Sequence, residues 1–217
     1  AMSTDYFPRL AAINTDNKEM NVAVNQQADV AILLITPVIV LFLTFAPLVV
    51  ELLYSSKFNV IIGFVTFGVL GTFFKAVSFS LGYVVIAKGH SKVFITLSVV
   101  FNSIFLTISI ISYTIGGLTG LGIGFLIYYF LHFIVLKVLT NYLYQIRLAT
   151  SFYRTFFVCA IICGCCFMTT LVETVYLRYL LMSITVIFSL LYTLRQFDKK
   201  MDLKDFIRSI FKKEPKE

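Results

Sequence analysis

The feature that most constrains this chain is a series of long apolar stretches that recurs from about residue 30 to about residue 194. Six of them stand out between polar segments: 30–50, 58–87, 93–113, 118–136, 155–172 and 176–194. A helix of about 20 apolar residues crosses the hydrocarbon core of a bilayer. No long run of alternating polar and apolar residues suggests barrel strands. The pattern therefore predicts an all-α integral membrane protein with about six transmembrane helices.

The composition excludes a soluble globular domain. Of the 217 residues, 59% are hydrophobic and 13% are charged, whereas a soluble domain carries about 25% charged residues. The formal net charge is +7, but no basic stripe with interleaved aromatic residues occurs in a polar segment, as a nucleic-acid-binding surface would require. We therefore expect the lipid bilayer, and no nucleic acid, as a partner of this chain.

The apolar stretches divide the chain into three parts. Residues 1–29 are expected to be the cytoplasmic end of a preceding helix and a loop, residues 30–194 a six-helix transmembrane domain, and residues 195–217 a basic cytoplasmic tail. The first residues show no signal-peptide pattern, and we expect the chain to be a fragment. Apolar residues recur in the tail at helical spacing, which suits an amphipathic helix on the anionic cytoplasmic surface. A packed or partly disordered tail fits equally well. The apolar residues are Leu203, Phe206, Ile207, Ile210 and Phe211.

The placement of the basic residues predicts the orientation. Most Lys and Arg residues lie before the first stretch, between the second and third, between the fourth and fifth, and after the sixth. The loops on the other side carry only Lys57 and Arg178. Loops rich in Lys and Arg stay on the cytoplasmic side of a membrane. Both ends of this chain are therefore expected to be cytoplasmic.

Lys75 is a charged residue near the middle of a predicted transmembrane helix. A charge at the bilayer centre costs at least about 2.5–3.5 kcal/mol, so such a residue usually faces a bundle interior or a water-filled cavity. Helical spacing places it on a small and polar face, opposite an apolar face. A fixed cation there favours an anionic head group such as phosphate. Two alternatives stay open, namely that Lys75 snorkels to an interface or pairs with an acid elsewhere. The other residues of its face are Gly68, Gly71, Thr72, Ser78, Phe79 and Gly82.

Glycines and prolines inside the stretches predict features of helix packing. Gly116, Gly120 and Gly124 repeat every fourth residue, a spacing that lets two membrane helices approach closely. This run does not match a nucleotide-binding fingerprint, because the third glycine is missing and no strand precedes it. Pro37 and Pro47 lie in the first stretch and predict a kinked helix.

No arrangement of residues indicates an enzyme, a metal centre or a cofactor. Cys159, Cys163, Cys165 and Cys166 lie in an apolar run, where cysteine acts as a small hydrophobic residue and not as a zinc ligand. His132 stands alone among aromatic residues and is expected to pack. No phosphate-binding lysine motif, zinc-protease motif or nucleophile with a paired base occurs. The sequence therefore predicts a protein that is not an enzyme and that needs no cofactor.

Several segments of the first 150 residues resemble a known family. They are MSTDYFPRLAAI, VNQQADVAILLITPVIVLFLTFAPLVVELLYSSKF, FFKAVSFSLGYVVIAKGHSKVF and GGLTGLGIGFLI. In this order they are similar to the second half of polysaccharide (O-antigen type) flippases of the multidrug/oligosaccharidyl-lipid/polysaccharide exporter superfamily. The resemblance fades over the last two apolar stretches.

The resemblance implies a fold and an activity. The fold would have two lobes of six helices around a central cavity, and this chain would supply the second lobe after its first two helices, plus two C-terminal helices. The activity would be alternating-access transfer of an undecaprenyl-diphosphate-linked oligosaccharide from the cytoplasmic to the periplasmic leaflet of the bacterial inner membrane, for surface polysaccharide synthesis. By this analogy Lys75 neutralises the diphosphate with Thr72 and Ser78 beside it, and Arg9 serves in gating or contacts the head group. The implied partners are the oligosaccharide lipid and enzymes of polysaccharide assembly.

Two other functions stay open from the sequence. One is a cation-coupled drug or metabolite antiporter of the same superfamily, which an intramembrane acid in another part of the protein would favour. The other is a membrane enzyme of the polysaccharide pathway, such as a polymerase or an acyltransferase. Large periplasmic loops with Arg or His clusters would favour that enzyme, and the loops predicted on that side are short.

Overall fold

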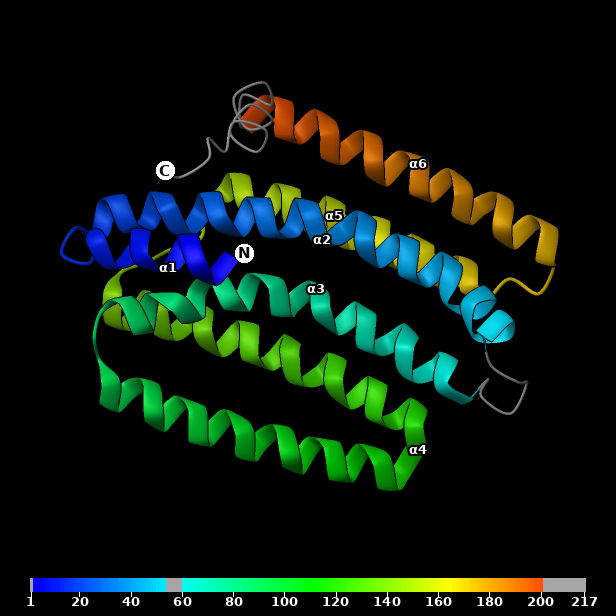
Figure 1. Cartoon of the computed structure of the whole chain (residues 1–217), viewed down its shortest axis with the longest axis horizontal. Helices are drawn as coiled ribbons and strands as arrows, with labels where there is room; N and C mark the ends of the chain where they lie inside the picture. Colours follow the sequence, from blue (N-terminus) through cyan, green and yellow to red (C-terminus); the bar gives the residue numbers. More distant parts are fainter. Residues whose placement is uncertain (1, 54–59, 201–217) are drawn as a thin grey trace, which may run out of the picture.

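The computed structural model describes residues 2–53 and 60–200, which form helices joined by short connections (Figure 1). No strand occurs in this described part, and the predicted all-α class is confirmed. The tail helix predicted over residues 203–211, and Lys57, lie outside the described residues. The helices are α1 (Met2–Ala12), α2 (Asn17–Leu53), α3 (Val60–Ala87), α4 (Ser91–Tyr144), α5 (Thr150–Thr170) and α6 (Val175–Lys200).

Five of the described helices, α2 to α6, are long and apolar enough to cross a membrane. α4 contains 54 residues, and as a straight helix it would extend about 80 Å, far beyond a hydrocarbon core of about 30 Å. Instead it turns back on itself at Gly116 and Gly117 (Figure 1). Its two arms, 91–115 and 118–144, therefore provide two crossings. The chain is a multi-pass membrane protein whose crossings match the six predicted stretches.

The turn in α4 depends on glycine. Gly117 has φ 57° and ψ −141°, and Gly116 has φ −128° and ψ 15°. Residues with a side chain rarely adopt a positive φ, whereas glycine does so without a steric penalty. At the open end of this hairpin, Nδ1 of His90 lies 3.0 Å from the hydroxyl oxygen of Tyr144. The two arms thus meet at both of their ends.

Glycines also let the two arms of α4 pack closely. A Cβ atom added at Gly120 would lie 2.1 Å from the carbonyl oxygen of Ser112, and one at Gly124 would lie 2.3 Å from the hydroxyl oxygen of Ser112. Gly122 lies against the backbone of α3 in the same way. The packing role predicted for Gly120 and Gly124 is confirmed. Gly116 differs, because it belongs to the turn and a Cβ atom there would meet nothing within 4 Å.

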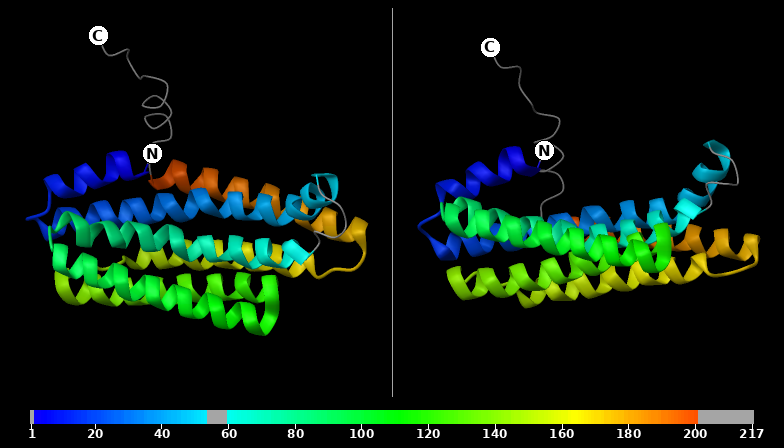
Figure 2. Two further views of the ribbon diagram at one scale, coloured as in Figure 1. Left: turned by 60° about the horizontal axis from the view of Figure 1, so that its bottom comes forward. Right: turned by 90° about the horizontal axis from the view of Figure 1, so that it is seen from below.

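α2 lies at the centre of the bundle. It packs against α3, α5 and α6, while α4 packs against α3 and α1 lies against α3 and α2 (Figures 1 and 2). Large apolar side chains remain exposed on the outer helices, including Ile115 at 83% and Ile161 at 64%. Soluble monomers rarely expose so much contiguous apolar surface, which lipid would cover. The buried side chains of α2 include Met20, Val24, Ile32, Ile39 and Val40.

α2 is longer than the first predicted stretch and is bent. It begins at Asn17, so it continues without a break through residues 29 and 30. Pro37 and Pro47 both lie inside it, and its last turns deviate from the line of the rest of the helix (Figure 2). Proline removes a backbone N–H and bends a helix in this manner. The predicted kink is therefore present.

The described basic residues, apart from Lys75 and Arg178, gather at one end of the bundle. We call this the basic end; it comprises α1, the start of α2, the α3–α4 and α4–α5 connections with the turns beside them, and the end of α6. Asp16 caps α2 there, because its carboxylate accepts hydrogen bonds from the backbone N–H groups of Lys18 (2.7 Å) and Glu19 (3.1 Å). These bonds lower the pKa of the Asp16 carboxyl below its ordinary value. Lys88 then donates to the side-chain oxygen of Asn17 at 2.6 Å, which ties the end of α3 to the start of α2.

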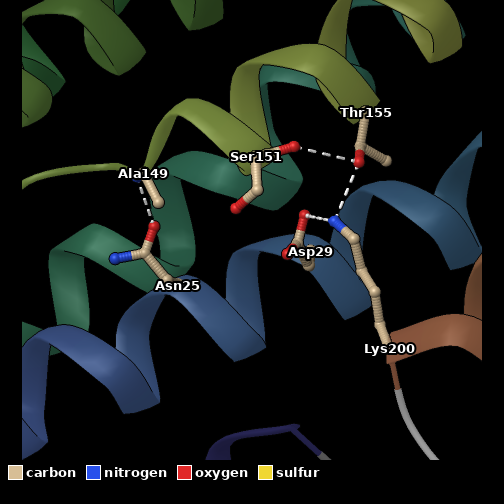
Figure 3. A network of polar contacts seen from close by, with 6 residues as sticks. All are labelled: Asn25, Asp29, Ala149, Ser151, Thr155 and Lys200. Carbon is tan, nitrogen blue, oxygen red and sulfur yellow. Dashed lines mark hydrogen bonds and ion pairs between the residues drawn. The ribbon is translucent and has the colours of Figure 1, made fainter.

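An ion pair ties α6 to the rest of the bundle near this end. Nζ of Lys200 lies 2.7 Å from Oδ1 of Asp29 in α2 and donates a hydrogen bond of 2.8 Å to the hydroxyl of Thr155 in α5 (Figure 3). The two charged side chains are 25% and 15% exposed. Removing one partner of such a pair leaves a partly buried charge without compensation. The contact therefore fixes α6 against both α2 and α5.

The close approach of the two α4 arms leads to a prediction about stability. The substitution Gly120→Ala should lower the free energy of unfolding by about 1–3 kcal/mol, because the new methyl group collides with backbone that cannot move aside. Gly68→Ala is the matched control, since a Cβ atom there meets nothing within 4 Å and alanine favours a helix over glycine. Thermal unfolding of the purified protein in detergent measures both. Equal effects of the two substitutions would contradict the packing account.

Candidate functional site

Lys75 lies near the middle of α3, and its ammonium group is surrounded by aromatic rings. Nζ lies 5.1 Å from the ring centroid of Tyr129, 5.5 Å from that of Phe79 and 5.8 Å from that of Phe125. We call these three rings the aromatic cage. A cation within about 6 Å of an aromatic ring gains about 0.5–1 kcal/mol when exposed and about 2 kcal/mol when desolvated. Three such contacts are comparable with the 2.5–3.5 kcal/mol or so that a charge costs at the membrane centre.

The small residues on the face of Lys75 let α4 come close enough to form this cage. Gly71 is buried, and a Cβ atom there would lie 2.7 Å from the ring of Phe125. The opposite face of α3 is apolar as predicted, and Phe73, Val77 and Leu81 are buried in the core of the bundle. The pattern of residues around Lys75 therefore directs the apolar side of α3 inward and its small side toward α4.

A groove of about 300 Å³ adjoins the aromatic cage. It runs between α3 and the two arms of α4 and shares the ring of Phe79 with the cage. Its lining combines aromatic rings with hydrogen-bonding groups, a combination that suits a ligand with both polar and apolar faces. The polar residues of the lining are Ser78, Tyr83, Ser98, Asn102, Tyr128 and His132.

The polar groups of this site lie at about the same depth in the bundle. Lys75 is near the midpoint of α3, Asn102 near that of the first arm of α4, and His132 near that of the second arm. Contacts between the segments agree, because the ring of Phe101 lies 4.3 Å from that of His132, while Lys75 contacts Tyr129. Hydrocarbon does not solvate such groups. We therefore expect this groove to be hydrated or to bind a ligand.

His132 packs against the rings of Phe101 and Tyr128, and it also lines the groove. Its Nδ1 is buried and accepts or donates no hydrogen bond within residues 2–53 and 60–200. Asn102 donates from Nδ2 to the carbonyl of Ser98 at 2.8 Å. Neither residue was predicted from the sequence to belong to the site. The available signal was their central position in apolar stretches, the same signal that identified Lys75.

The other predicted site residues divide between two places. The hydroxyl of Ser78 donates to the carbonyl of Phe74 at 2.9 Å, and that of Thr72 donates to the carbonyl of Val69 at 2.6 Å. Both residues share the helix face of Lys75, and Ser78 lines the groove. Arg9 is exposed on α1 and lines a separate depression between α1 and α2, away from the contacts of Lys75.

The cysteines contribute to packing between helices. Cys159, Cys163 and Cys166 are buried and Cys165 is exposed, and all four are free thiols. Sγ of Cys166 lies 3.8 Å from the carbonyl oxygen of Val40 in α2. Among the residues whose positions are described, no group of His, Cys, Asp or Glu side chains is arranged to hold a metal ion.

Comparison with known proteins gives a match over the N-terminal part of the chain. Residues 1–63 match the model of a family described as polysaccharide biosynthesis protein. The matched part covers α1, α2 and the beginning of α3, and it supports a role in polysaccharide biosynthesis. A search of curated proteins and a search of solved structures each gave no match.

The position of Asn102 leads to a prediction about hydration. In a variant whose four native cysteines are replaced by alanine, Asn102→Cys should react quickly with a water-soluble maleimide, because a thiol must be hydrated to form the reactive thiolate. Leu106→Cys is the matched control one helical turn away, where the side chain is 61% exposed on the same arm and outside the groove. Rates measured in membranes compare the two. Equal rates, or a faster reaction at 106, would show that the groove is not hydrated.

Proposed function

We propose that this chain is part of a transporter that moves a polyprenyl-diphosphate-linked oligosaccharide, of the undecaprenyl class, across the bacterial inner membrane. The observation that carries the proposal is the cation of Lys75 at mid-membrane depth, held in the aromatic cage beside a groove with polar lining. The match of residues 1–63 to a polysaccharide biosynthesis family supports the same class of substrate.

Lys75 would serve as the counter-charge of the diphosphate. A diphosphate that enters hydrocarbon loses its hydration, and an ion that is unpaired there carries a large free-energy penalty. A fixed ammonium group within the membrane lowers this penalty through a charge-assisted contact. Within the described residues the ion pair of Asp29 is with Lys200, and no acid contacts Lys75. In this described part, the ammonium group is stabilised by the quadrupoles of Tyr129, Phe79 and Phe125, and an incoming anion could supply the counter-charge.

The groove beside Lys75 gives the polar head a path that the lipid tail does not need. Hydroxyl, amide and imidazole groups from α3 and from both arms of α4 line it, while the outer faces of the same helices are apolar. The head group would cross through this hydrated region while the polyprenyl chain remains in the bilayer. Alternating access would require the helices around the groove to rock, and the proline-containing α2 provides a bent element in the bundle.

We further propose that the basic end faces the cytoplasm. Loops rich in Lys and Arg remain on that side, and the described α5–α6 turn at the opposite end is short. In this orientation both ends of the transmembrane part lie on the cytoplasmic side. The substrate would then be taken up from the leaflet that the basic residues contact.

Transport by the full-length protein in proteoliposomes tests the proposal. Lys75→Gln should reduce the translocation of a polyprenyl-diphosphate-linked oligosaccharide by about tenfold or more, the loss expected for one hydrogen bond to a charged group. Lys75→Arg should retain a larger share of the activity because it keeps the charge. Lys92→Gln, which removes an exposed cation at the basic end, serves as the matched control.

The outcomes separate the possible roles. Transport by wild type and by the Lys92 variant, with loss in a folded Lys75→Gln variant, is the expected result. Unchanged transport by Lys75→Gln would reduce Lys75 to a packing residue. Movement of small organic cations instead of the oligosaccharide lipid would contradict the proposal and favour a drug antiporter.

A further inference from the structure

We propose that a pocket between α4 and α5 at the basic end binds the phosphate group of an anionic phospholipid. The pocket has a volume of about 250 Å³ and shares no lining residue with the groove beside Lys75. Its polar lining includes Lys137, Asn141, Arg147 and Tyr153, and its apolar lining includes Val138 and Ile146. We call it the α4–α5 pocket.

Two cationic side chains line the α4–α5 pocket, and no acidic side chain of the described residues lines it. Nζ of Lys137 lies 4.7 Å from the ring centroid of Tyr153, and Arg147 extends from the α4–α5 connection into the same lining. Like charges that share a small space repel each other, and the repulsion grows as the dielectric constant of the surroundings falls. A bound anion converts this repulsion into two charge-assisted contacts.

The connection that carries Arg147 is held rigidly against α2. The backbone N–H of Arg147 donates to Oδ1 of Asn21 at 2.8 Å, and its carbonyl accepts from Nδ2 of Asn25 at 2.9 Å. The backbone N–H of Ala149 donates to Oδ1 of Asn25 at 2.7 Å (Figure 3). Asn21 and Asn25 are one turn apart on α2, so one face of a long helix fixes the backbone on both sides of residue 147.

The side chain of Arg147 is oriented as well. Its Nε donates to Oδ1 of Asn141 at 2.8 Å, while its terminal Nη groups hydrogen-bond to no other residue of the described chain. A guanidinium group held at Nε presents its remaining N–H donors in a planar fork, which matches two oxygens of a phosphate. A site with a fixed backbone and a fixed side chain loses little entropy when an anion binds.

The position of the pocket favours a lipid phosphate over a soluble one. It lies where α4 ends and α5 begins, next to exposed apolar residues of α4 such as Val138 (60% exposed). Acyl chains can follow that surface while the head group reaches the two cations. Its volume is below the 300–1,000 Å³ or so of sites that enclose whole small molecules, which suits a head group alone. Basic pockets between membrane helices on the cytoplasmic side bind anionic head groups.

Lipid binding to the purified full-length protein tests the inference independently of transport. Native mass spectrometry would measure the affinity of phosphatidylglycerol and, as the zwitterionic comparison, phosphatidylcholine. Arg147→Gln should weaken phosphatidylglycerol binding about fivefold, which corresponds to about 1 kcal/mol for one cation near the membrane surface. This substitution preserves the backbone hydrogen bonds to Asn21 and Asn25. Lys92→Gln, at the same end but outside the pocket, is the matched control.

A double variant sharpens the test. If one phosphate contacts both cations, the losses from Lys137→Gln and Arg147→Gln should be non-additive, because they share a partner. Equal losses in the Lys92→Gln control would overturn the inference in favour of a diffuse surface charge. Displacement of phosphatidylglycerol by inorganic phosphate at comparable concentration would identify a soluble anion as the ligand and contradict the lipid. Equal affinity for phosphatidylglycerol and phosphatidylcholine would also contradict it.

Discussion

The hydrocarbon core of a bilayer offers neither hydrogen bonds nor solvation for charge, and the arrangement of this chain follows from that constraint. Backbone groups at membrane depth are satisfied within long helices, and even the 54-residue α4 stays helical on both sides of its glycine turn. Near that depth, Asn102 and His132 line one groove, which adjoins the aromatic cage of Lys75. Lys75 illustrates the balance, because three aromatic rings and a small-residue face accommodate a cation that lipid would exclude.

The same constraint separates the molecule into a middle region and a basic end that are stabilised by different interactions. In the middle region, glycines permit close contact, as Gly120 and Gly124 do between the arms of α4 and Gly71 does between α3 and α4. At the basic end, hydrogen bonds and one ion pair hold the connections, with Asn25 fixing the α4–α5 connection and Asp29 holding the end of α6 (Figure 3). The two proposals would use both regions. A lipid phosphate would bind at the basic end, and the diphosphate of the substrate would contact Lys75 at mid-depth.

Much of the fold could be predicted from residue patterns, and the limits of prediction have physical reasons. Apolar length fixes the number of crossings because the bilayer has a set thickness. The break between residues 113 and 118 was predicted from the apolar stretches, but the turn at Gly116 and Gly117 was not, since Gly116 also fits a packing motif. Lys75 was recognisable because a charge in an apolar stretch is costly. Asn102 and His132 also lie centrally in apolar stretches, but that they line one groove depends on which segments become neighbours. The Asp29–Lys200 pair joins residues 171 positions apart, so no local sequence pattern indicates it.

The distribution of polarity across the membrane is the central claim, and the sidedness of its two ends tests it most directly. In a variant with the native cysteines replaced by alanine, Glu173→Cys marks the α5–α6 turn and Lys92→Cys marks the start of α4 at the basic end. A membrane-impermeant maleimide that has passed the outer envelope should label position 173 in intact cells and position 92 only after the inner membrane is permeabilised. Labelling of both positions from the same side would contradict the crossings, and the reversed pattern would contradict the cytoplasmic placement of the basic end.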